Sequence, residues 1–134
     1  MKIVKINPGE ELRDKIEKFC AENNIKTAWI NALGSSEELE LAYYNLSNKE
    51  YETKIFNERL EIVALVGNVA LKGDKPFAHI HGTFSRPSME VIGGHINKCV
   101  ISATCEVSIW PSEKILERKY DGQTGLHLLC NIEP

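Results

Sequence analysis

The feature that most restricts the fold of this chain is a succession of β-type segments that starts at Thr27. From Ile101 to Ile109, apolar and polar residues alternate, which is typical of a strand with one buried face. Other segments with strand composition are residues 1–6, 27–32, 39–46, 51–56, 61–71, 77–84 and 126–132. Because short turns join these segments, the sequence predicts mainly antiparallel pairing.

One helical pattern lies near the N-terminus, where apolar residues recur at helical spacing as Leu12, Ile16, Phe19 and Cys20. An amphipathic helix is expected at about residues 9–22, with Asn7 as its cap. The chain of 134 residues fits one domain, residues 1–134. We therefore expect an α+β fold, a mainly antiparallel twisted sheet flanked by an N-terminal helix.

Two details of the strands carry further expectations. The strand that starts at Thr27 is expected to break at residues 34–36, and a hairpin is expected to join residues 39–46 to 51–56. Residues 61–71 are apolar on both alternations, which predicts a central strand covered on both faces, with a bulge at Gly67. A lone helix covers one sheet face only, so curvature or partner subunits must cover the other.

Charge limits the choice of partners. The chain has 16 Lys and Arg against 19 Asp and Glu, a formal charge of −3, and no basic run. This balance argues against nonspecific DNA binding. The sequence leaves open whether some Lys and Arg residues gather on one face and form a local positive patch. With no signal peptide, no apolar stretch long enough to span a bilayer and four scattered cysteines, the chain is expected to be cytoplasmic, with no membrane contact.

The residues with the most specific chemistry are His79 and His81, followed by His95 after Gly93-Gly94. Side chains two apart in a strand point to the same face, so His79 and His81 project together. Glycines lacking a β-carbon would let the chain bring His95 close enough to complete a three-nitrogen metal site. The pattern predicts a divalent metal ion with an open coordination position. Zinc fits this ligand set, although the residue types are also compatible with Fe, Ni or Mn. The alternative interpretation is that His79 and His81 are simply two solvated side chains on an exposed strand.

Two further residues are candidates for supporting roles. Glu106 lies on the polar alternation of its strand, where it could accept a hydrogen bond from a ligand imidazole or act as a general base; a salt-bridged or solvated sheet residue is the favoured alternative. Gly94 is a candidate pocket residue beside His95. His127, between Leu126 and Leu128, is interpreted as a sheet histidine rather than a ligand.

Several segments together resemble a known family. They are residues 59–67 (Arg-Leu-Glu-Ile and a hydrophobic strand ending in Gly), 79–81, 93–96, Glu106 in its alternating strand, Arg118, Asp121 and 124–126. Their order is similar to that of the PPC domain, the plants-and-prokaryotes conserved domain. The resemblance implies an antiparallel sheet flanked by helices, a homotrimer, and clustered histidines able to bind metal near the subunit contacts.

The resemblance also implies a second function, because in plants this domain accompanies AT-hooks in nuclear DNA-binding proteins. No hook is present here, since Arg86-Pro87 follows Phe84-Ser85 and is only a turn. The leading hypothesis is a metal-binding homotrimer that holds a small-molecule ligand or supports metal-assisted chemistry. The alternatives are a DNA-binding or regulatory assembly domain, which predicts salt-sensitive duplex binding, and a purely structural oligomerisation module. Whether the chain is an enzyme stays open.

Overall fold

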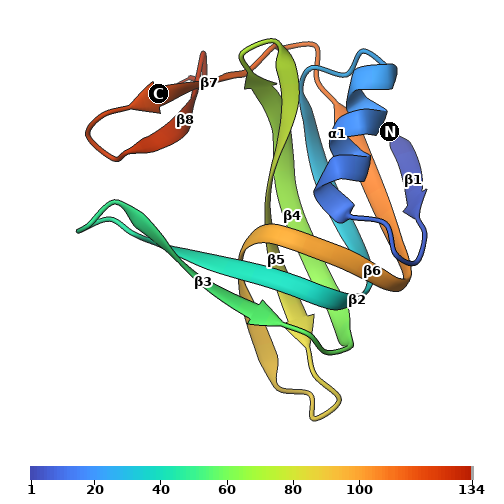
Figure 1. The fold of residues 1–134 in the computed structure, drawn as a ribbon. Helices are drawn as coiled ribbons and strands as arrows, with labels where there is room; N and C mark the ends of the chain where they lie inside the picture. The colour runs from blue at the N-terminus through green and yellow to red at the C-terminus, as the bar shows by residue number, and fades with distance from the viewer. Residues whose placement is uncertain (134) are drawn as a thin grey trace.

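The computed structural model describes residues 1–133 and consists almost entirely of strands (Figure 1). The elements are β1 (Lys2–Ile6), α1 (Leu12–Glu22), β2 (Ala28–Asn45), β3 (Glu50–Phe56), β4 (Leu60–Lys72), β5 (Lys75–Ser85), β6 (Val91–Pro111), β7 (Glu117–Asp121) and β8 (Leu126–Cys130). The predicted hairpin is confirmed as β2 and β3, which pair from Leu39 opposite Phe56 to Asn45 opposite Glu50. Among the described residues, no helix is long and apolar enough to cross a membrane.

The expected α+β class is wrong, because strands make up 65% of the chain and helix only 8%. The strands cover their own inner face: β2 pairs with β6, β6 with β5, β5 with β4, and β4 again with β2, so these four form a closed ring. A sheet closed in this way needs little cover from helices. Its inner face carries fully buried side chains that include Phe84, Ile80, Ile96 and Ile101.

The helix α1 is shorter than expected and begins at Leu12. Its cap is Glu11 rather than Asn7: the Glu11 carboxylate accepts from the backbone N–H of Asp14, and its other oxygen accepts from the N–H of Cys99 on β6. A carboxylate at this position satisfies a free N–H of the first turn. Glu11 thus ties the start of the helix to the long strand that carries His95.

The strand β2 does not break at residues 34–36 but runs on as a bent strand. Its register shifts on both sides of Gly34, so the first half pairs with β4 and β6 and the second half with β6 and β3. The prediction that 61–71 is covered on both faces is also wrong for this chain, since Val63 is 54% and Val66 46% exposed. Closure of the ring leaves these outward side chains without a covering layer.

Two hairpins extend from the ring to the same side of the molecule, β2–β3 and β7–β8 (Figure 1). They are joined where the hydroxyl of Tyr44 donates to the carbonyl oxygen of Thr124 at 2.6 Å and the ammonium of Lys49 donates to that of Gly122 at 2.9 Å. The β7–β8 hairpin is thereby fixed close to the strands that carry the histidines.

Candidate metal centre

The three predicted histidines converge. His79 and His81 lie on β5, and His81 is directly opposite His95 on β6. Directly paired residues of antiparallel strands share a face, so all three rings lie on one side of the sheet. The Nε2 atoms of His79 and His81 are 3.2 Å apart, and one nitrogen from each ring lies within 4.8 Å of the others.

The protonation of this cluster favours metal binding. Burial, with smaller contributions from the Arg118 guanidinium and the other two histidines, lowers the pKa of His79 to about 4. Burial also lowers the pKa of His95 to about 4, reinforced by His81, Arg13 and Arg118. Both rings are therefore neutral at pH 7 and offer lone pairs without first losing a proton.

Glycines make the convergence sterically feasible. A β-carbon on Gly93 would lie 2.7 Å from the carbonyl oxygen of Gly82, and one on Gly94 would lie 3.1 Å from that of Ala42. Neither glycine has positive φ, so their role here is close approach of backbones rather than an unusual turn. Gly94 packs against Ala42 of β2 and is not among the residues that line the cavity beside the histidines.

Glu106 lies elsewhere in the same chain. It is exposed in the middle of β6, opposite Lys5 of β1 and Leu33 of β2, and lines a surface depression with Asn31 and Ser108. The structure therefore does not bring Glu106 together with the histidines within this chain. His127 is exposed on β8, its ring 5.6 Å from that of Tyr120, and lies outside the three-histidine group.

A cavity of about 260 Å³ opens beside the cluster. No local sequence pattern predicted its walls, which come from β3, β4, β5, β6 and the β7–β8 hairpin and include Tyr51, Lys72, Phe77, Arg118 and Leu126. Arg118 was noted only as part of the family resemblance. Its Nη2 atom donates to Oδ1 of Asn68 at 2.7 Å and lies 3.3 Å from Nδ1 of His79.

The residues present fit a transition-metal ion. Three imidazoles on one face are a common ligand set for zinc with an open position. The 3.2 Å between the Nε2 atoms of His79 and His81 matches two nitrogens about 2.0–2.1 Å from a shared ion in tetrahedral geometry. Among the residues that the structure describes, the group of possible ligands consists of these three histidines, so its donors are nitrogen atoms.

Comparison with known proteins supports the predicted family. The sequence model of the Plants and Prokaryotes Conserved (PCC) domain matches residues 1–112. A search among curated proteins found no match.

Solved structures share the whole fold. A metal-containing protein from Archaeoglobus fulgidus is 38% identical, with a TM-score of 0.91, over 97% of this chain and 92% of that one. A plant- and prokaryote-conserved protein from Pyrococcus horikoshii is 28% identical, with a TM-score of 0.91, over 99% and 92% of the two chains. A candidate DNA-binding protein from Bacteroides thetaiotaomicron is 29% identical, with a TM-score of 0.92, over 96% and 90%. The resemblance inferred from the order of the motifs is thus confirmed, and this chain belongs to the Plants and Prokaryotes Conserved domain family.

Proposed function

We propose that this chain is a metal-binding protein that works as a homotrimer, with His79, His81 and His95 holding a zinc ion and an adjacent cavity receiving a small ligand. The observation that carries the proposal is the convergence of three imidazole nitrogens within 4.8 Å. The similarity to the metal-containing protein from Archaeoglobus fulgidus supports it.

The chain's own residues define what the site could do. His79 and His95 are neutral at pH 7, so a divalent ion held by them would keep its positive charge. When bound with an open position, such an ion polarises an oxygen or acidifies water. His79 and His95 are half-buried and line the cavity, so the open position of such an ion would face the cavity.

An outward apolar surface supports self-association. We define this outer apolar face by the exposed side chains Trp29, Leu33, Val63, Val66 and Trp110 on β2, β4 and β6. Val66 is directly opposite His81, so His81 lies on the same side of the sheet as this face. A second and third copy packed on it would bury this apolar surface and bring subunit contacts near the metal site.

The proposal is tested by measuring metal content and native mass on one sample. Protein purified without chelator should contain about one zinc per chain, an expectation that follows from one three-nitrogen site per chain. The native mass should equal three chains and should persist after zinc is removed. Purified protein without stoichiometric metal would contradict the metal centre, whereas dissociation on zinc removal would favour the structural oligomerisation module.

The histidine pKa values predict how the metal-free protein responds to acid. His79 and His95 have a pKa of about 4 when folded and an ordinary value near 6.5 when unfolded. Between these values the unfolded chain binds more protons, so the free energy of unfolding falls as pH decreases from 6.5 toward 4.

Urea unfolding of metal-free protein at several pH values checks this. His95→Asn should reduce the proton uptake on unfolding by up to about one proton. An equal slope in wild type and His95→Asn would show that His95 is not buried as a neutral ring.

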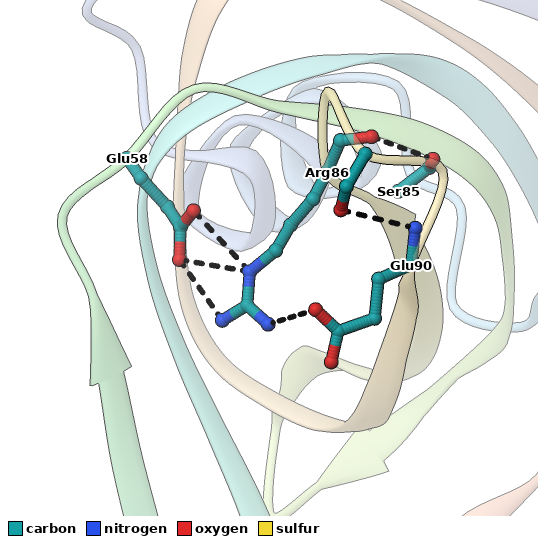
Figure 2. A network of polar contacts seen from close by, with 5 residues as sticks. Glu58, Ser85, Arg86 and Glu90 are labelled. Atoms are coloured by element: carbon teal, nitrogen blue, oxygen red, sulfur yellow. Dashed lines mark hydrogen bonds and ion pairs between the residues drawn. The ribbon is translucent and has the colours of Figure 1, made fainter.

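DNA binding is the second candidate, and the similarity to the candidate DNA-binding protein from Bacteroides thetaiotaomicron favours it. The charge of this chain does not, and the Arg-Pro turn is already engaged: Arg86 is held between the carboxylates of Glu58 and Glu90, as Figure 2 shows. A gel-shift experiment with duplex DNA at low salt separates the two candidates, because phosphate contacts are strongest there. Absence of a shift under those conditions excludes this candidate.

A further inference from the structure

The cavity beside the histidines is strongly cationic. Among its lining residues are Lys72 and Arg118, and none is acidic. In the described part of the chain, neither Lys72 nor Arg118 lies in an ion pair with a carboxylate. Both cations instead lie near the ring of Phe77, at 5.1 Å and 5.9 Å from its centre. A pair of uncompensated positive charges at a small cavity favours an anionic occupant.

The guanidinium of Arg118 has unused donors. Nη1 donates to the carbonyl oxygen of His127 at 3.1 Å, and Nη2 donates to Oδ1 of Asn68, but the buried Nε has no partner. A buried charged donor without an acceptor is costly, and such a group commonly marks a place where a ligand completes the hydrogen bonding.

Metal binding would free a further donor. In the metal-free chain Nδ1 of His79 lies 3.3 Å from Nη2 of Arg118 and can accept from it. A neutral imidazole that binds a cation through Nε2 carries its hydrogen on Nδ1, so Nδ1 becomes a donor and can no longer accept. Arg118 then needs another acceptor, and the added positive charge of the ion strengthens the preference for an anion.

The remaining walls indicate the size and character of that anion. About 260 Å³ accommodates only a small molecule, and Phe77, Leu126 and Leu128 provide apolar surface suited to a short carbon chain. The planar fork of arginine matches the two oxygens of a carboxylate. We propose that Arg118 and Lys72 form a subsite for the carboxylate of a small organic acid, placed next to the three histidines. This inference rests on the proposed metal centre.

The test uses zinc-loaded full-length protein and the probe lactate, with lactamide as the neutral counterpart of the same shape. Calorimetric titration should detect lactate, with lactamide at least about tenfold weaker, since a charge-assisted hydrogen bond contributes more than a neutral one. Arg118→Met should raise the Kd for lactate about tenfold or more while zinc content stays at the wild-type value. Lys72→Met should raise it less, because Lys72 is exposed at the rim.

Matched controls separate this effect from net charge. Lys75 pairs directly with Lys72 but does not line the cavity, and Arg59 is exposed and lines a different cavity. Lys75→Met and Arg59→Met should leave lactate binding unchanged. If Arg118→Met does not fold, Arg118→Lys and Lys72→Met carry the test, since Arg118→Lys keeps the charge and loses the fork.

The outcomes that overturn the inference differ from those that overturn the metal centre. Normal zinc content with equal binding of lactate and lactamide, or with no effect of Arg118→Met, Arg118→Lys and Lys72→Met, overturns the subsite alone. Tighter binding of inorganic phosphate than of lactate overturns the assignment to an organic acid. Absence of zinc from wild-type protein overturns the metal centre and this inference with it.

Discussion

His79→Ala is expected to abolish stoichiometric zinc binding. The ring of His79 is central to the cluster, with its Nε2 3.2 Å from that of His81 and its centroid 5.0 Å from that of His95. Removing it leaves two nitrogens, one on each of two strands. The loss of affinity should exceed the roughly 10- to 100-fold that follows removal of a residue that only supports a ligand. Elemental analysis and competition with a chromophoric chelator measure the effect.

The matched control for this prediction is His127→Ala, which removes the same side chain from an exposed position on β8. It should bind zinc as wild type does. His79→Ala should still fold, because the ring belongs to the outward side of β5 and the buried neighbours Ala78 and Ile80 are unchanged. Retention of one zinc per chain by His79→Ala would show that the ion is held elsewhere.

The candidate site was predictable from sequence because its geometry is local. Alternation in a strand places His79 and His81 on one face whatever the rest of the fold does. His95 could be added because only a short hairpin separates it from them. Neither step needs knowledge of distant contacts, and this is why the convergence of the three rings was expected before the structure.

The fold class was not predictable in the same way, because ring closure is a long-range event. It depends on β2 bending so that Ala28–Ala32 pair with both β4 and β6. Nothing near residues 34–36 distinguishes a bend within a strand from a turn between two strands, and the glycine there was interpreted as a break. An open sheet needs helices to cover one of its faces, which is why an α+β class was expected. The class was therefore wrong because the bend in β2, and with it the closure of the ring, was not predicted.

The residues around the site were also hidden from sequence reasoning. Arg118 and Phe77 are far apart in the chain, and they meet only because the β7–β8 hairpin is fixed over β4 and β5. For Glu106, alternation correctly placed the side chain on the outward face of β6, and its exposure agrees with the favoured interpretation as a solvated sheet residue. The supporting role beside the histidines could not be judged from sequence, because β6 is 21 residues long and Glu106 lies far along it from His95. The face to which a side chain points can be predicted from local alternation. Its distance from a site elsewhere on a long, bent strand depends on the whole fold and cannot be predicted in the same way.

Gly67 is the position where a single added carbon should damage both the fold and the site. It was expected to mark a bulge, yet no register shift occurs at it; Gly67 pairs regularly with Ile80. A β-carbon there would lie 2.3 Å from the carbonyl oxygen of His79 and 3.1 Å from the Cα of Ile80. Both are backbone atoms, so they cannot turn aside as a flexible side chain would. The backbone of β5 must therefore shift at His79, which is one of the proposed metal ligands.

Gly67→Ala is therefore expected to lower the free energy of unfolding by about 1–3 kcal/mol, the usual cost of overpacking, and to weaken zinc binding about tenfold. The control is Gly122→Ala, since a β-carbon on Gly122 meets no atom within 4 Å and its φ is not positive. That variant should stay within about 0.5 kcal/mol of wild type. Urea unfolding and zinc competition on both variants measure the two effects. Wild-type stability of Gly67→Ala would mean that β4 and β5 separate freely, whereas lost stability with unchanged zinc affinity would mean that the histidines adjust to a displaced strand.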